Sequence, residues 1–218
     1  MTEQHRREIR SFVLRAGRMT EGQQRAWDSQ WPLWGLQVSD GTPDLEVSFG
    51  RTAPLVMEIG FGMGHSLAAQ ALVNPDTNYL GVEVHKAGIG KLFNSLLEQE
   101  SNNVRVYCED AVTVLRDCIP ENGLDGLQIF FPDPWHKKKH NKRRLIQAGF
   151  VELIASRLKP GGFLHLATDW ENYAEQMLEV IDADHNFSND AGVGQFSPRP
   201  DSRPLTKFER RGQRLGHG

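Results

Sequence analysis

From residue 55 onwards, short apolar runs alternate with longer segments in which apolar residues recur every three or four positions. Short apolar runs beside glycine are typical of buried parallel strands, and the longer spacing is typical of helices with one apolar face. The predicted strands are 55–59, 79–84, 104–107, 124–131 and 163–167, and the predicted helices are 65–73, 89–97, 111–118, 145–158 and 170–181. This alternation predicts an α/β fold with a parallel sheet covered by helices on both faces.

Ligands of such sheets bind beyond the carboxyl ends of the strands, at the point where the strand order reverses. After the first strand, Gly60, Gly62 and Gly64 permit a tight turn and the close approach of a ligand. The dinucleotide fingerprint would need glycine in place of His65, so the loop favours a smaller cofactor segment. A glycine-rich turn that binds nothing is the alternative.

Acidic residues follow the next two strands. Glu83 could accept hydrogen bonds from two ribose hydroxyls, and Asp110, which follows Glu109, could accept from an adenine amino group. Acids at such positions can also do no more than cap the next helix. Together with the glycine loop, they describe an adenosine site at three successive strand ends.

The fourth strand is followed by Pro132-Asp133-Pro134-Trp135. A stiff backbone, a carboxylate and a flat ring suit a pocket for a planar base, although a rigid turn would have the same composition. The fifth strand ends in a similar pair, Asp169 and Trp170. There the alternative is that Asp169 caps the following helix.

Basic residues are clustered, although the formal net charge is −3. Of the 25 lysines and arginines, six lie within 6–25, six within 137–144 and six within 199–214. This distribution indicates local basic surfaces on an acidic body. The 137–144 run lies at the mouth of the predicted site, where phosphates are its natural partners. The alternative interpretation of this run is a solvated surface that binds nothing.

No metal site and no membrane segment are predicted. His136 and His140 have a helical metal-ligand spacing, but six neighbouring cations disfavour a metal ion there. Cys108 and Cys118 lack a metal-ligand spacing and indicate reduced cysteines of a cytoplasmic protein. No apolar run approaches the roughly 20 residues that cross a bilayer.

The length of 218 residues suits one domain with an added arm. Residues 1–50 show no strong periodicity and are predicted to form a basic arm, which packs Trp27, Trp31 and Trp34 onto the domain at 51–218. No internal repeat or low-complexity segment interrupts that domain.

Several segments, in order from Leu14 to His217, resemble the family of bacterial tRNA (guanine-N7-)-methyltransferases. They are LRAGRMT, MEIGFGMGHSLAAQA, YLGVEVH, EDA, FFPDPWHKKKHNKRR, LKPGGFLHLATDW and RPLTKFERRGQRLGH. The resemblance implies a Rossmann-like class I methyltransferase fold with a mostly parallel, seven-stranded sheet and S-adenosylmethionine as methyl donor. The implied reaction is methylation of N7 of guanine 46 in the variable loop of tRNA.

The resemblance also implies roles for individual residues. Those implied at the donor site are Glu58, Gly60, Gly62, Gly64, Glu83, Asp110 and Asp133, of which Asp133 is also the implied catalytic residue. Those implied to contact the substrate are Lys137, Asp169, Thr206, Lys207, Phe208 and Glu209. Those implied to contact RNA are Lys139, His140, Asn141, Lys142, Arg143 and Arg144. The expected partner is tRNA, and the expected state is a monomer or homodimer.

Guanine N7 already carries an in-plane lone pair, so its methylation needs orientation rather than a base. We therefore expect Asp133 to act by position and charge, and Asp169 to accept from the guanine N1 and N2 donors. A methyltransferase for an exocyclic amino group is one alternative, but such enzymes typically carry Asn/Asp-Pro-Pro-aromatic where this chain has Pro-Asp-Pro-Trp. The other is a non-catalytic RNA-binding subunit, against which the acids at four strand ends argue.

Overall fold

The computed structural model describes residues 18–200, 203 and 204. The strands are β1 (Gly35–Leu36), β2 (Leu55–Ile59), β3 (Asn78–Val82), β4 (Val104–Tyr107), β5 (Leu124–Phe130) and β6 (Leu158–Ala167). The α-helices are α1 (Glu21–Trp34), α2 (Leu45–Phe49), α3 (His65–Val73), α4 (Lys86–Glu98), α5 (Ala111–Cys118), α6 (Ala148–Arg157) and α7 (Glu171–Asp182). Two 3-10 helices, η1 (Val38–Asp40) and η2 (Lys138–Arg143), complete the set for this part of the chain.

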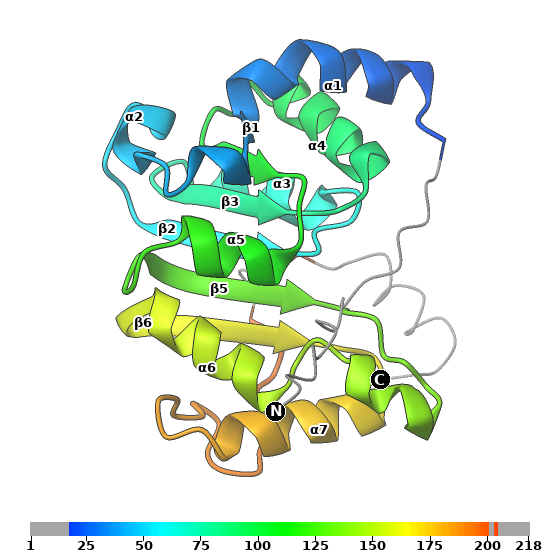
Figure 1. Cartoon of the computed structure of the whole chain (residues 1–218), viewed down its shortest axis with the longest axis vertical. Helices are drawn as coiled ribbons and strands as arrows, with labels where there is room; N and C mark the ends of the chain where they lie inside the picture. The colour runs from blue at the N-terminus through cyan, green and yellow to red at the C-terminus, as the bar shows by residue number, and fades with distance from the viewer. Residues whose placement is uncertain (1–17, 201–202, 205–218) are drawn as a thin grey trace, which may run out of the picture.

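The strands form one six-stranded parallel sheet in the order β1-β4-β3-β2-β5-β6 (Figure 1). From β2 the chain builds outward through β3 and β4, then returns to the other side of β2 to form β5 and β6. The strand order therefore reverses between β2 and β5, and the carboxyl ends of these two strands mark the expected ligand site. The predicted parallel α/β sheet is confirmed. A seventh strand is not found among the described residues.

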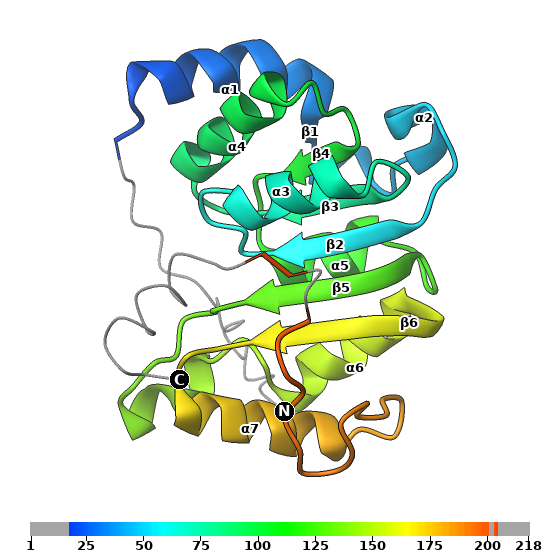
Figure 2. The ribbon, with the colours of Figure 1, turned by 180° about the vertical axis from the view of Figure 1, so that it is seen from behind.

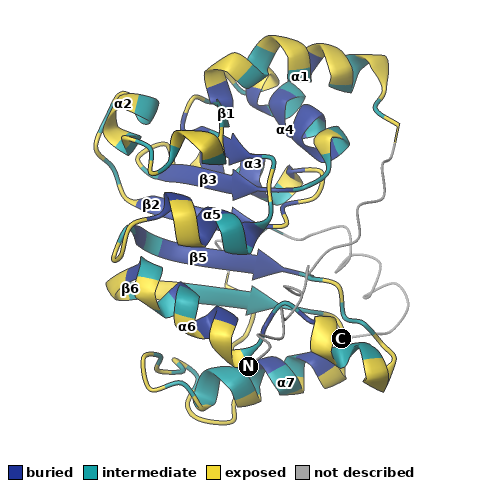
Figure 3. Cartoon of the chain, viewed as in Figure 1, coloured by how far each residue is buried: buried dark blue, intermediate teal, exposed yellow. Residues whose placement is uncertain are grey.

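Helices cover both faces of the sheet, as predicted. Helices α5 and α6 lie in front of it in Figure 1, whereas α3 lies on the opposite face, which Figure 2 shows. Successive side chains of a strand point to opposite faces, so Met57 packs with Leu115 and Ile154, and Val56 packs with Leu67 and Leu92. Every residue of β2 and β3 is buried, and this places the core along the central strands (Figure 3).

The segment before residue 50 contributes structure that its sequence did not indicate. Helix α1 begins at a capping box, in which Thr20 and Gln23 bond to each other's backbone amides. The helix packs along α4, where Trp34 meets the edge of the Phe93 ring at 5.3 Å between centroids. Strand β1 then pairs with β4 and becomes the edge of the sheet.

Several element boundaries differ from those predicted, and two of the differences have a clear local cause. Helix α6 begins at Ala148 rather than at residue 145, because the backbone at Gln147 is extended. Strand β6 begins at Leu158, before the Lys159-Pro160-Gly161-Gly162 turn that was expected to precede it. The turn lies within the strand as an irregularity in its pairing with β5, and Gly161 supplies the positive φ that it needs. Among the described residues, no helix is long and apolar enough to span a membrane.

Candidate active site

The glycine loop between β2 and α3 has the backbone that only glycine adopts readily. Gly60, Gly62 and Gly64 have φ values of 71°, 58° and 74°. A side chain at Gly64 would lie 2.6 Å from Leu92 of α4, so this glycine serves packing. At Gly60 and Gly62, a Cβ atom would meet no described atom within 4 Å. The loop thus presents open backbone at the point where the strand order reverses.

Glu83 fastens the glycine loop to the end of β3. Its buried carboxylate accepts the amide N–H of Gly62 through Oε2 at 2.9 Å. Oε1 accepts the amides of Val84 and His85 at 2.7 and 3.0 Å and lies 2.9 Å from His85 Nδ1. Because an ionised carboxylate offers about four acceptor positions, Oε2 retains capacity for a ligand hydroxyl.

Glu58 is a buried carboxyl group behind the same loop, with 2% of its surface exposed. Its Oε2 accepts the side-chain amides of Gln128 on β5 at 3.0 Å and Gln70 on α3 at 3.4 Å. Burial raises the pKa of Glu58 to about 8, although the Gln128 hydrogen bond acts in the opposite direction. The group is therefore mostly protonated at neutral pH, and a cation bound beside it would favour its ionised form.

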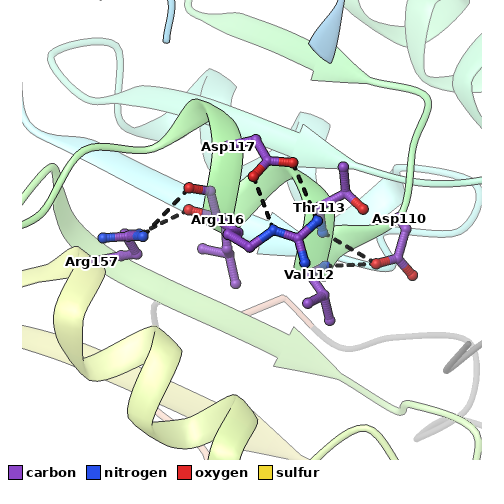
Figure 4. A network of polar contacts seen from close by, with 7 residues as sticks. Asp110, Val112, Thr113, Arg116, Asp117 and Arg157 are labelled. Atoms are coloured by element: carbon purple, nitrogen blue, oxygen red, sulfur yellow. Dashed lines mark hydrogen bonds and ion pairs between the residues drawn. The ribbon is translucent and has the colours of Figure 1, made fainter. Parts of the chain in front are cut away.

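Asp110 caps helix α5, as the alternative interpretation expected. Its Oδ1 accepts the amides of Val112 at 2.9 Å and Thr113 at 3.2 Å (Figure 4). The carboxylate is half-buried, and the cap occupies only one of its two oxygens. In the same view, Arg157 of α6 donates to backbone carbonyls of α5, which fixes the helix that carries this acid. A capping role therefore leaves room for a ligand contact through Oδ2.

The loop after β5 is strained on both sides of Asp133. Phe131 and Trp135 have φ values of 53° and 43°, which non-glycine residues seldom adopt. Pro132 and Pro134 fix the backbone between them. Asp133 itself is exposed at the carboxyl end of the sheet. Strain of this kind persists where the surrounding structure holds it, most often at functional sites.

Asp169 lies at the neighbouring strand end and does not cap a helix. The N-cap of α7 is Trp170, which has no side-chain capping bond, and Asp169 is exposed. Phe130 and Ala167 pair at the ends of β5 and β6, so the loops that carry Asp133 and Asp169 leave the sheet side by side. The structure therefore places both predicted base-contacting carboxylates beyond the carboxyl ends of neighbouring strands of the sheet.

The basic segment, residues 137–144, forms the 3-10 helix η2 with short extensions. Five of its cations are exposed at the surface, namely Lys137, Lys138, Lys139, Lys142 and Arg143, whereas His140 and Asn141 are half-buried. Arg143 lies over the Trp135 ring at 5.1 Å from its centroid. Arg144 is different, because it is buried and its guanidinium donates to acceptors on Pro134, Asn172 and Gln176.

The two histidines of this region contact different tryptophans. His136 meets Trp170 at 4.2 Å between ring centroids, and His140 meets Trp135 at 6.1 Å. Desolvation and the nearby cations, first of all Arg143, lower the pKa of His140. Within the described part of the chain, no group of three or more histidine, cysteine or acidic side chains could hold a metal ion.

Arg203 also reaches the site, although nothing in the sequence around it singled it out. It is buried, and its guanidinium lies 5.4 Å from the ring centroid of Phe130 and 5.9 Å from that of Phe131. The chain that leads to it, drawn orange to red, crosses the sheet face opposite α6 (Figure 2). Arg203 lies in a basic stretch of the sequence, so its burial against these two rings could not be inferred. The predicted substrate contacts at Thr206, Lys207, Phe208 and Glu209 lie outside the described residues.

Sequence comparisons with known proteins agree on one family. A family model described as "Putative methyltransferase" matches residues 52–218. A protein of Ectopseudomonas mendocina is 56% identical over 98% of this chain and 90% of its own length, and one of Pseudomonas paraeruginosa is 58% identical over 97% and 87%. A protein of Alcanivorax borkumensis is 56% identical over 97% and 89%. All three are named tRNA (guanine-N(7)-)-methyltransferase. A solved 16S rRNA methyltransferase, KamB, is 16% identical over 74% of this chain and 69% of its own, with a TM-score of 0.45.

Proposed function

This chain belongs to the tRNA (guanine-N(7)-)-methyltransferase family, and we infer from that premise that it transfers a methyl group from S-adenosylmethionine to N7 of a guanine in tRNA. The observation that carries this function is the identity of 56–58% with such enzymes over nearly the whole chain. Guanine 46 of the variable loop is the proposed target. We also propose that the protein is a monomer or homodimer and that its sheet has seven strands.

The residues at the carboxyl ends of β2, β3 and β4 fit an adenosine-containing donor. The open backbone at Gly60 and Gly62 leaves space for it, and Glu83 and Asp110 each keep acceptor capacity for its ribose and adenine. Glu58 lies behind the loop, where the ammonium group of a bound donor would favour the ionised form of its carboxyl group. When bound, S-adenosylmethionine supplies a methyl group on a positively charged sulfur.

Asp133 and Asp169 are the proposed partners of the guanine. N7 has a lone pair and no proton, so no base has to act before it is methylated. Methylation places positive charge on the guanine ring, and a fixed carboxylate at Asp133 would stabilise that charge. Asp169 would accept from N1 and N2 and align the ring. Lys137 and Thr206 to Glu209 are proposed as further substrate contacts.

The exposed cations of the basic segment are the proposed tRNA contacts. Lys139, Lys142 and Arg143 point away from the core and would bind phosphates, which supply much of the affinity of proteins for nucleic acids. His140 and Asn141 would line the same surface. This docking would bring the variable loop to the edge of the sheet that carries Asp133.

Nucleoside analysis of tRNA incubated with the protein and S-adenosylmethionine tests this function. We expect 7-methylguanosine to be formed and no methylated exocyclic amino group to appear. Methylation of a guanine or adenine amino group would favour the alternative enzyme class. Absence of any methylated nucleoside, with tRNA and donor both bound, would favour the non-catalytic RNA-binding subunit.

A further inference from the structure

Arg144 joins the loop after β5 to helix α7. Only 3% of its surface is exposed. Nε donates to the Pro134 carbonyl at 2.9 Å, and Nη2 donates to Asn172 Oδ1 at 2.9 Å. Nη1 donates to Gln176 Oε1 at 2.6 Å and to the Asn172 carbonyl at 3.3 Å. The guanidinium carbon also lies 4.7 Å from the centre of the Tyr173 ring.

A second set of bonds ties the same helix to the chain just after Arg144. The amide of Ile146 donates to the hydroxyl of Tyr173 at 3.1 Å, and the Gln176 side chain donates to the Ile146 carbonyl at 3.0 Å. One face of α7 therefore binds the segment from Arg144 to Ile146 through three of its side chains. Because these bonds are buried or half-buried, breaking one would leave polar groups without partners.

This connection joins the two segments that hold the exposed carboxylates. The carbonyl that accepts from Arg144 belongs to Pro134, the residue directly after Asp133. The helix that accepts from Arg144 begins at Glu171, two residues after Asp169. Trp135, the residue after Pro134, has its strained φ of 43°. A fixed guanidinium beside it opposes relaxation of the loop.

We propose that Arg144 is a positioning residue, which sets the separation of the Asp133 and Asp169 carboxylates and does not bind RNA. The proposal rests on the proposed function, in which these two carboxylates hold the guanine. Arg144 would thus have a different role from the exposed cations beside it. Lysine cannot replace it, because a single ammonium lacks the planar fork that reaches the Pro134 carbonyl and α7 together.

The test compares Arg144→Lys with Arg143→Gln, its exposed neighbour. For Arg144→Lys we expect kcat at saturating tRNA to fall about tenfold to hundredfold, the scale of a misplacement near 1 Å. The salt dependence of tRNA binding should stay that of the wild type in Arg144→Gln as well, a variant that removes the positive charge which lysine keeps. For Arg143→Gln we expect the slope of log affinity against log salt to become shallower by about 0.7 to 0.9. A shallower slope for Arg144→Gln, with kcat unchanged in Arg144→Lys, would overturn the proposal.

Asn172→Ala and a double variant distinguish positioning from general loss of structure. Asn172→Ala removes the Nη2 partner without touching the basic segment, and it should lower kcat while leaving the salt slope unchanged. In Asp133→Asn/Arg144→Lys, the two losses should be far from multiplicative, because Arg144 acts through Asp133. Fully multiplicative losses would indicate a merely structural role. If the wild type methylates no tRNA, the proposed function fails, whereas the salt slopes still test Arg144.

Discussion

Asp133 combines an exposed carboxylate with a backbone that two prolines and two strained neighbours hold in place. Asparagine has nearly the same shape but no charge. If the carboxylate stabilises the cation that forms on the methylated guanine, Asp133→Asn should lower kcat by roughly 10²–10³. Single-turnover kinetics at saturating tRNA and donor would measure this. Binding of tRNA should change little, because phosphate contacts dominate it.

The pH dependence of the same reaction separates charge from proton transfer. N7 has no proton to lose, so the wild-type rate should show no acidic limb that requires an ionised base of raised pKa. A limb at about pH 6–7 that disappears in Asp133→Asn would support a general base instead. Turnover near that of the wild type by the asparagine variant would refute the electrostatic role.

At the scale of elements, apolar patterning was enough to predict most of the sheet and its helices. The bounds of β2, α3, β4 and α5 were predicted to the residue, because buried strands and amphipathic helices follow the two periods of the backbone. Helix α1 was missed because its apolar period is weak and Pro32 lies within it. The Thr20 and Gln23 pair was its one usable signal, as the start of a capping box.

At the site, too, some features could be predicted from the sequence and others could not. Residues at strand ends were found because topology alone brings them to one edge of the sheet. The burial of Arg144 was not predictable, because it depends on acceptors that α7 supplies from 28 to 32 residues away. The position of Arg203 on the Phe130 ring likewise depends on tertiary packing.

The exposed cations of the basic segment lie together on η2 and its flanks, so their contribution to tRNA binding can be tested as a group. Replacing Lys139, Lys142 and Arg143 with glutamine should reduce the slope of log tRNA affinity against log salt by roughly two to three. Donor affinity should be unchanged. Lys159→Gln is a matched control, since Lys159 pairs with Asp125 at the amino ends of the strands. Equal slopes for wild type and triple variant would make the segment a solvated surface.

At the scale of the whole molecule, Glu58 links stability to pH. Its pKa is raised from 4.5 to about 8 by burial, so the folded protein keeps a proton that the unfolded chain releases above about pH 4.5. The stabilisation is therefore complete below that pH and is lost as pH rises towards about 8. The free energy of unfolding should fall by up to about 1.4 kcal/mol per pH unit across this range.

Glu58→Gln, which keeps a neutral group of similar shape, isolates this contribution. Chemical unfolding of the donor-free proteins between pH 5 and 8 should show a smaller pH dependence for the variant than for the wild type. Gln70 and Gln128 can still bond to the new amide oxygen, so the variant is expected to fold. Parallel pH dependences would show that Glu58 is ionised in the folded protein.

We propose that N7 of guanine 46 in tRNA receives the methyl group at the edge of the sheet that carries Asp133. The most direct measurement uses a tRNA with 7-deazaguanine at position 46, in which a C–H group replaces N7 and the amino group is intact. With labelled S-adenosylmethionine, the unmodified tRNA should be methylated, whereas the 7-deaza tRNA should bind with similar affinity and receive no label. Methylation of the 7-deaza tRNA at an undiminished rate would contradict the account.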